Sequence, residues 1–548
     1  MTYINIISYP ASYFNITDLL FKKYLKLGSF IDTLLFLCYN NHVNLFFEVL
    51  MKVVNIMNFA RSFEPRDLET EKLLAKTTFD QLDLVNEMGV PATFLLQYDV
   101  IANEEFVKGI KERAGENIEL GFWYEVVEPL TTACGMPYNS ERGWKWDWYI
   151  NPGFSVAYPV KEREILIDEA MRKFKEVFGY YPRTVGSWLL DTYTVNYLSE
   201  NYEIDALCYC RDQVNTDAYT FVGGYFNQAY YPSRNHMFIP ASSDETQVNI
   251  PTFRLLGPDP IYNYDNGKYA SEGCKHGPYT MELVHDRTSG RNPKIVDWYL
   301  DSYFRNESLG FAYMQIGQEN SFAAYDIVPP LRMQIEKIKA LGDVKIEKMC
   351  DTGKAFKERY SSTPATSVCA LKNWDTPDLQ SVYYDSKNYT ANVMRMDDKV
   401  FIRSLYLFDD RIVDVYNTSP CTTFDSVYES LPLVDTYYQR GDTDGGLGLI
   451  LDECATPFSA REYSEGELIL SWNDKSVIFK DKSIIIKNCT LSFTYSMVNT
   501  KISVENDCIY YEYNSHKYKL CVSGGEVSKR DGTITIKGEE ITVTPTKI

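Results

Sequence analysis

From Met51 onward, short runs of apolar residues alternate with longer segments in which apolar residues recur every three to four positions. The short runs predict buried β-strands, and the longer segments predict amphipathic helices. Strands that alternate with helices form a mostly parallel sheet, open or closed. Glycines mark the ends of two expected helices, at Gly89 and Gly179. The expected strands span residues 53–59, 92–96, 118–122, 184–190, 206–210, 252–256 and 310–316.

The fourth of these strands, Thr184 to Leu190, is a continuous apolar run that brings Trp188 and then Asp191 to its C-terminal end. Two interpretations of Asp191 remain open. An aspartate after a strand is often the N-cap of the next helix, and the spacing alone favours that role. A catalytic carboxylate beside a tryptophan wall is the other, because the C-terminal ends of the strands carry the chemistry in a β/α barrel.

Beyond about Asp351 the pattern changes to short β-branched segments separated by Asp, Asn, Gly and Lys. This texture predicts an all-β sandwich, with hairpin turns at Asp531-Gly532 and Lys537-Gly538. The expected organisation is an N-terminal extension at 1–50, an α/β catalytic domain at 51–345, a linker at 346–370 and the sandwich at 371–548.

The first fifty residues show no regular helical or strand period. Their longest apolar run, Ile31 to Cys38, is too short to span a bilayer, and no signal-peptide pattern is visible. We expect an extension outside the functional domain and a cytoplasmic protein with reduced thiols.

Composition narrows the possible partners. The formal net charge of −20 argues against nucleic acid and anionic membranes, which both require basic patches. The 12 cysteines and 5 histidines show no metal-site spacing, so neither a metal nor another cofactor is expected. Aromatic residues make up 15% of the chain, which suits either sugar recognition or core packing. Oligomeric state is left open.

Carboxylates follow several of the expected strands, and a closed barrel would bring them to one mouth. Paired carboxylates cleave glycosidic bonds, because one donates a proton to the leaving oxygen and the other attacks or activates water. The chain has no phosphate-binding glycine loop, G-x-S-x-G elbow or H-E-x-x-H motif. The strand-end carboxylates are Glu125 or Glu128, Asp191, Asp212, Asp259 and Glu319.

The segment from Met51 to Gly342 resembles the glycoside hydrolase and polysaccharide deacetylase superfamily of seven-stranded β/α barrels. Trp188 and Asp191 are similar to the Trp-x-x-Glu nucleophile motif of glycoside hydrolase family 57, with Asp in place of Glu, as in the family 38 α-mannosidases. The resemblance implies a (β/α)7-type barrel followed by a C-terminal all-β sandwich domain. The metal-binding Asp and His pairs of the deacetylases are not matched, since Asn58, Arg61 and the stretch from Trp123 to Glu128 stand there.

The resulting hypothesis is a glycoside hydrolase that acts on an oligosaccharide or small glycoside, with Asp191 as nucleophile and Glu319 as general acid/base. One alternative is a metal-dependent carbohydrate deacetylase that uses Glu125, Glu128 and Asp212. Another is a sugar-binding protein without catalysis. The residues expected to bind substrate are Trp123, Glu125, Glu128, Trp146, Trp188, Arg211, Asp212, Gln213, Asp259 and Gln318.

A loop with three alternating tryptophans, Trp144, Trp146 and Trp148, is expected to cover the barrel mouth and stack on a sugar ring. In an extended segment these rings share one face, and Lys145 and Asp147 take the other. Anchoring of the loop to the barrel rim is the alternative.

Overall fold

The computed structural model describes residues 50–210, 221–255, 257–263, 279–437, 448–494 and 500–548. The chain divides into the units Met1–Val49 and Leu50–Ile548, and the description covers the second. The expectations for the N-terminal extension and for Arg211, Asp212 and Gln213 lie outside the described residues.

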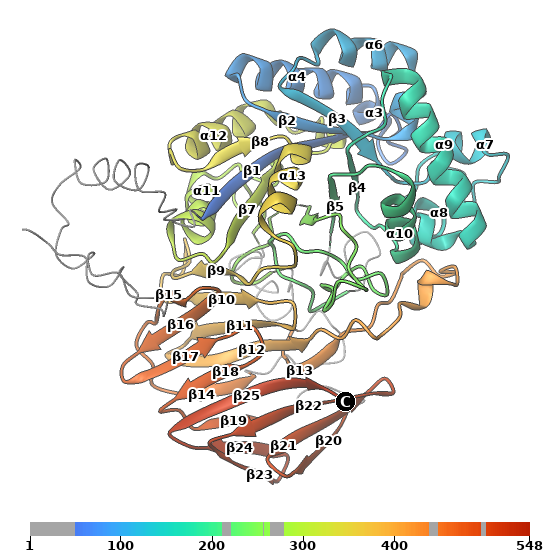
Figure 1. Ribbon diagram of the computed structural model, residues 1–548. Helices are drawn as coiled ribbons and strands as arrows, with labels where there is room; N and C mark the ends of the chain where they lie inside the picture. Colours follow the sequence, from blue (N-terminus) through green and yellow to red (C-terminus); the bar gives the residue numbers. More distant parts are fainter. Residues whose placement is uncertain (1–49, 211–220, 256, 264–278, 438–447, 495–499) are drawn as a thin grey trace, which may run out of the picture. The chain divides into compact units, whose positions relative to one another are not determined.

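A parallel sheet forms a nearly closed seven-stranded barrel, in the order β6-β5-β4-β3-β2-β1-β7 (Figure 1). Across the remaining gap, the ring of Phe253 on β6 lies 5.0 Å from that of Tyr313 on β7. The predicted barrel is therefore confirmed. Its strands are β1 (Met51–Ala60), β2 (Ala92–Leu96), β3 (Ile118–Trp123), β4 (Thr184–Ser187), β5 (Ala206–Tyr209), β6 (Thr252–Arg254) and β7 (Phe311–Ile316).

Two helices end at the glycines that the sequence pattern marks as helix ends. Gly89 and Gly179 end α4 and α9 in the left-handed region, with φ of 62° and 86°. The helices are α3 (Leu68–Glu71), α4 (Leu74–Met88), α5 (Tyr98–Ile101), α6 (Glu104–Arg113), α7 (Glu128–Ala133), α8 (Ile150–Gly153), α9 (Val160–Phe178), α10 (Thr192–Asn201), α11 (Pro293–Leu300), α12 (Val328–Lys339) and α13 (Met349–Arg359). Short helical turns are η1 (Ser155–Ala157), η3 (Asp301–Arg305), η4 (Asn320–Phe322) and η5 (Val415–Asn417).

The fourth strand is shorter than predicted, because it ends at Ser187 and not at Leu190. The hydroxyl of Ser187 donates to the carbonyl of Leu189 at 2.9 Å and accepts from the Leu189 N–H at 3.3 Å. This local side-chain bonding competes with the strand ladder and turns the chain toward α10.

Residues 346–370 are not a linker. They complete β8 (Lys345–Glu347), which runs parallel to β1, and form α13 and the first sandwich strand, β9 (Thr366–Ala370). Helix α13 buries Met349 and Phe356 and packs closely on the barrel, because a Cβ at Gly353 would lie 2.2 Å from the carbonyl oxygen of Asp205.

The C-terminal part is an antiparallel β-sandwich, as predicted. One sheet has the order β23-β24-β19-β14-β12-β11-β10-β9 with β13 beside β12, and the other has the order β15-β16-β17-β18-β25-β22-β21-β20. Apolar side chains of both sheets form one core, for example Ile402 and Phe479. The remaining strands are β10 (Gln380–Asp385), β11 (Tyr389–Met396), β12 (Lys399–Leu407), β13 (Leu431–Asp435), β14 (Leu449–Asp452), β15 (Ser459–Ser464), β16 (Glu467–Trp472), β17 (Lys475–Phe479), β18 (Ile484–Lys487), β19 (Leu491–Thr494), β20 (Thr500–Glu505), β21 (Cys508–Tyr513), β22 (His516–Ser523), β23 (Glu526–Arg530), β24 (Thr533–Lys537) and β25 (Glu540–Lys547).

The two predicted turns differ in outcome. Asp531-Gly532 joins β23 to β24 as a hairpin, with φ of 49° and 80°. The hairpin expected at Lys537-Gly538 is wrong, because β25 pairs with β18 and β22 in the other sheet. Gly538 serves close packing instead, since a Cβ there would lie 2.3 Å from the carbonyl oxygen of Gly524.

An irregular segment between β12 and β13, residues 409–430, is called the strap. It bonds to the barrel half at several points: the Ile150 N–H donates to the carbonyl of Phe424 at 3.1 Å, and the Cys421 N–H donates to the carbonyl of Val156 at 2.8 Å. The strap therefore joins the sandwich to the chain around α8. None of the helices in the described part of the chain has the length and apolar character of a membrane-spanning segment.

Gly317 follows β7 and leads to Glu319. A substitution there tests how closely this part of the chain approaches β1. The φ of Gly317 is 120°, and a Cβ there would lie 2.0 Å from the carbonyl oxygen of Met57. We expect Gly317→Ala to lower the free energy of unfolding by more than about 3 kcal/mol, because the substitution combines backbone strain with a clash against β1. Denaturant unfolding followed by circular dichroism measures it.

The matched control is Gly89→Ala, which also changes a glycine with positive φ but meets open space. It should cost about 1 kcal/mol. Equal losses in the two variants would contradict a tight approach of Gly317 to β1.

Candidate active site

Three aromatic rings form a floor at the C-terminal end of the barrel. The rings of Phe59 and Trp123 are stacked with centroids 3.9 Å apart, and Trp188 meets them edge-on at 5.5 and 5.9 Å. All three are buried. Gly186 on β4 makes this packing possible, because a Cβ there would lie 2.4 Å from the Leu95 side chain and 3.4 Å from Trp123.

The next polar layer comes from residues two positions further along the strands. Side chains two residues apart share a face of a strand. The ladder continues past the regular strands, since the Gln97 N–H donates to the Ala60 carbonyl at 3.0 Å and the Tyr124 N–H to the Gly186 carbonyl at 2.7 Å. Arg61, Gln97 and Glu125 therefore extend the rows of Phe59, Leu95 and Trp123.

Arg61 is the centre of this layer. Its Nη2 lies 2.7 Å from Glu64 Oε2 and 3.6 Å from Glu319 Oε1, and its guanidinium lies 3.8 Å from the ring centroid of Trp146. The side chain is only 2% exposed. A guanidinium taken out of water needs paired anions, so Arg61 holds Glu319 and the tryptophan loop at one place.

Glu125 is buried beside this group. The indole Nε1–H of Trp146 donates to its Oε2 at 2.5 Å. Burial raises the pKa of Glu125 to about 7, with a further increase from Glu319, while Arg61 and the Trp146 hydrogen bond oppose the shift. A carboxyl group with a pKa near neutrality can hold a proton at neutral pH, which a general acid requires.

Several buried polar atoms of the layer make no hydrogen bond within the described residues. They are Asn58 Nδ2, both amide atoms of Gln97 and Glu125 Oε1. Folded proteins pair the large majority of such atoms. Donors and acceptors at the same strand ends suit a ligand with several hydroxyl groups.

The tryptophan loop matches its prediction in part. The Trp148 ring lies 5.3 Å from that of Trp144 and 5.9 Å from that of Trp146, so the three rings gather together. Lys145 is exposed as expected. Asp147 is not, because it is buried in an ion pair with Arg142.

Trp144 and Trp148 serve mainly to anchor the loop. The Arg142 guanidinium lies 4.0 Å from the Trp144 ring centroid and 3.8 Å from that of Trp148. Among the three, Trp146 is the one that bonds to a strand-end carboxylate. Stacking of the loop on a sugar stays a prediction.

Asp191 is the N-cap of α10, which confirms the first of its two interpretations. Its Oδ1 accepts from Arg163 Nη1 at 2.8 Å and from the Thr194 N–H at 3.0 Å, and its Oδ2 accepts from the Thr194 hydroxyl at 2.7 Å and from Ser155. The side chain is completely buried. Both oxygens are thus occupied, and a catalytic role for Asp191 stays a prediction.

The remaining predicted residues lie in different settings. Gln318 Oε1 accepts from the Leu283 N–H at 2.8 Å, and Asp259 accepts from three backbone N–H groups, including that of Tyr279 at 2.7 Å. Both side chains therefore organise loops. Glu128 is half-buried at the start of α7, and Arg211, Asp212 and Gln213 fall outside the described residues.

Four residues of this layer were not predicted as site residues from the sequence: Asn58, Arg61, Gln97 and Asp99. Burial raises the pKa of Asp99 to about 6, against hydrogen bonds from backbone N–H groups that include Ser62 at 2.7 Å. The available signal was position, since all four lie at or just after the ends of the first two strands.

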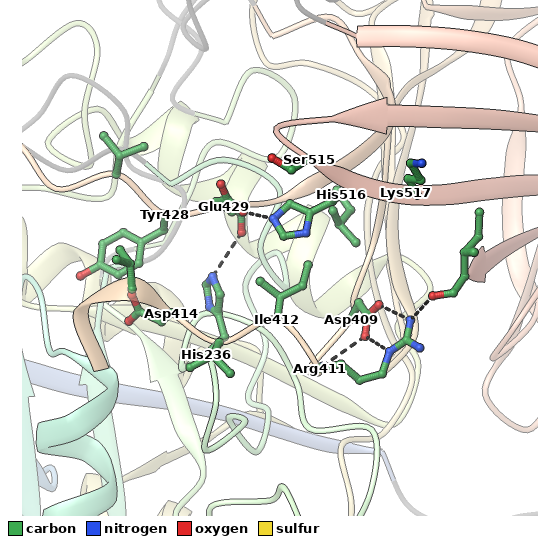
Figure 2. Close-up of a pocket in the computed structure, with 15 residues that line it drawn as sticks. His236, Asp409, Arg411, Ile412, Asp414, Tyr428, Glu429, Ser515, His516 and Lys517 are labelled. Atoms are coloured by element: carbon green, nitrogen blue, oxygen red, sulfur yellow. Dashed lines mark hydrogen bonds and ion pairs between the residues drawn. The ribbon is translucent and has the colours of Figure 1, made fainter. Parts of the chain in front are cut away.

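A cavity of about 840 Å³ lies elsewhere, between the strap, the β21–β22 turn and His236 (Figure 2). Its polar groups are largely paired with one another: His516 contacts the Glu429 carboxylate, and Arg411 lies 2.6 Å from Asp409. None of the strand-end carboxylates predicted from the sequence lines it. One carboxyl group of this cavity, Asp414, has a pKa raised to about 6 by burial, and its side chain accepts from the Thr192 hydroxyl at 2.7 Å.

Within the described ranges, no group of three or more His, Cys, Asp or Glu side chains is arranged to hold a metal ion.

Comparison with known proteins supports the fold. No protein-family model and no curated protein matches the chain. A candidate glycoside hydrolase/deacetylase from Parabacteroides distasonis has a similar structure, with a TM-score of 0.50 and 11% identity over 69% of this chain and 91% of that one. At this identity the similarity shows a shared fold.

Two further structures are more distant. A candidate polysaccharide deacetylase from Pseudomonas aeruginosa PAO1 has a TM-score of 0.36 and 12% identity over 56% of this chain and 91% of its own. A 4-alpha-glucanotransferase from Thermococcus litoralis has a TM-score of 0.29 and 9% identity over 91% and 100%. These two similarities are too weak to support a conclusion about this chain.

Replacement of Asp191 tests its structural role. Asp191→Ala leaves Arg163 buried without this partner, so we expect the free energy of unfolding to fall by about 3–5 kcal/mol. Asp191→Asn should cost less, because the amide oxygen can still cap α10. Chemical denaturation with a fluorescence readout measures both.

Glu203→Ala is the control, because it removes an ion pair to Arg183 in which Glu203 is 89% exposed. It should cost less than about 1 kcal/mol. An Asp191→Ala variant as stable as this control would show that the buried pair does not hold the fold.

Proposed function

We propose that the protein is a glycoside hydrolase in which Glu125 is the general acid and Glu319 is the second carboxylate. The carrying observation is the raised pKa of Glu125 next to the Arg61–Glu319 ion pair. A proton donor and a carboxylate at one site are what glycosidic cleavage needs. The sequence alone assigned the nucleophile to Asp191; we assign the pair differently because both oxygens of Asp191 are engaged in structural bonds.

In this proposal Glu125 protonates the leaving glycosidic oxygen, and Glu319 attacks the sugar or activates water. Arg61 positions Glu319, and the Trp146 indole orients Glu125. The floor of Phe59, Trp123 and Trp188 supplies an apolar surface that excludes water and faces the sugar ring. The substrate is an oligosaccharide or small glycoside.

A carbohydrate deacetylase is the second candidate, because the similar Parabacteroides protein carries both class names. Its expected metal ligands are Glu125, Glu128 and Asp212, the last outside the described residues. Metal analysis of the purified protein and assays with and without a chelator separate the two functions. Release of acetate that stops on chelation would favour the deacetylase.

Replacement of either proposed catalytic carboxylate should strongly reduce turnover. We expect Glu125→Gln and Glu319→Gln each to lower kcat/KM by at least about 100-fold with an unchanged fold. Release of reducing sugar from a panel of oligosaccharides and aryl glycosides measures the activity.

Glu105→Gln is the matched control, since Glu105 is exposed in the first turn of α6, and it should leave activity within a few-fold of the wild type. Full activity of either Glu125→Gln or Glu319→Gln would remove that residue from the mechanism.

The pH dependence follows from the raised pKa of Glu125. If protonated Glu125 is the acid, kcat/KM should fall as the pH rises above about 7. Trp146→Phe removes a hydrogen bond that lowers this pKa, so the basic limb of the profile should move to higher pH. Trp148→Phe keeps that bond and should not move it. If the basic limb does not move in Trp146→Phe, the limb does not report the pKa of Glu125.

The same shift predicts a stability effect with a defined sign. In the unfolded chain the pKa of a glutamate is about 4.3, so the folded protein holds a proton that the unfolded chain releases. Stability is then lost as the pH rises through about 7. Glu125→Gln carries no charge, so its Tm should exceed that of the wild type at pH 8 and approach it at pH 4.

A further inference from the structure

The hairpin of β21 and β22 places two cysteines opposite each other. Tyr513 pairs with His516 across the two-residue turn Asn514-Ser515, and the register then pairs Cys508 with Cys521. The turn residues have φ of 45° and 70°, which fits the tight turn of a two-residue hairpin. The opposition of the two thiols is therefore fixed by the turn.

The hydrogen-bond pattern defines the type of pair. The Val522 N–H donates to the Asp507 carbonyl at 2.9 Å, which makes Asp507 and Val522 a hydrogen-bonded pair. Such pairs alternate with non-hydrogen-bonded ones along an antiparallel ladder, so Cys508 and Cys521 form a non-hydrogen-bonded pair. In these pairs the Cα atoms are about 4.5 Å apart and the side chains approach closely. That spacing lies within the range of disulfides, about 4.4–6.8 Å.

The two thiols lie on the outer face of the sheet. Their neighbours Ile509, Leu520 and Val522 point into the sandwich core, whereas Cys508 and Cys521 are half-buried and reachable from solvent. Burial raises the pKa of the Cys508 thiol to about 11, and a hydrogen bond with Cys521 adds to the shift. The two side chains thus lie opposite each other on one face of the hairpin.

We propose that Cys508 and Cys521 form a redox-modification site that closes to a cross-strand disulfide when a low-molecular-weight disulfide, such as oxidised glutathione, is present. One thiolate attacks the glutathione disulfide and releases one reduced glutathione. The second thiolate attacks the mixed disulfide and releases the other. Two protein thiols are oxidised, one glutathione disulfide is reduced to two thiols, and the two protons leave to solvent.

The modified hairpin also borders a cavity. The tip of the same hairpin carries Ser515, His516 and Lys517, which line the cavity of Figure 2, and His516 contacts Glu429 of the strap. A disulfide across the strands staples the hairpin that holds this contact. In the cytoplasmic location expected from the sequence, the pair is reduced and responds to oxidation.

The test uses the full-length protein incubated with oxidised glutathione and then blocked with N-ethylmaleimide. Tryptic mapping without reduction should show residues 502–517 joined to residues 520–529, a link that reductant removes. Thermal unfolding of the oxidised protein should give a Tm about 5 °C higher than that of the reduced protein. Cys521→Ser should lose both the linked peptide and the Tm increase.

Cys454 is the internal control, since it is exposed and lies outside the strands. It should give a mixed disulfide with glutathione. The proposal is overturned if Cys454 is modified while Cys508 and Cys521 are recovered as separate maleimide or glutathione adducts. It is also overturned if the linked peptide forms only after the protein has been unfolded.

Discussion

The buried positive charge of Arg61 organises the mouth of the barrel. A guanidinium that is 2% exposed must be matched by nearby anions, and Glu64 and Glu319 supply them. The backbone of Arg61 is held as well, because its N–H donates to Asn320 Oδ1 at 3.1 Å and its carbonyl accepts from Asn320 Nδ2 at 2.9 Å. The end of β1, the chain after β7 and the tryptophan loop are all fixed around this one side chain.

A second buried arginine, Arg163, has a different arrangement of anionic partners. Arg163 and Asp191 form a pair in which both carboxylate oxygens are occupied by neighbours. At Arg61, by contrast, the adjacent Glu125 keeps one oxygen without a hydrogen bond in the described residues. Both carboxyl groups are buried, but Asp191 holds structural partners with both oxygens, whereas Glu125 has a raised pKa.

Periodicity was sufficient to predict the barrel strands, the ends of α4 and α9 and the sandwich, because these depend on local patterns. The site depended on contacts that the sequence does not reveal. Arg61 and Glu319 meet only once β7 lies beside β1. Likewise, Asp191 could be recognised as an N-cap by type, but its partner Arg163 comes from another helix. The supposed linker contained α13, whose buried face became evident only against the barrel.

The strap affects whether the barrel half can be produced as a separate fragment. Arg163 donates from the barrel side to the strap carbonyls of Tyr416, at 2.7 Å, and Ser419, at 3.2 Å. A fragment that ends after the barrel would lose these acceptors, and a buried guanidinium would keep only its remaining partners. The strap, which leaves the sandwich between β12 and β13, thus supplies hydrogen-bond acceptors to the buried guanidinium of Arg163 in the barrel half. The hydrophobic core of the barrel also continues onto the sandwich, because it includes Tyr383, Met394 and Phe401 of β10, β11 and β12.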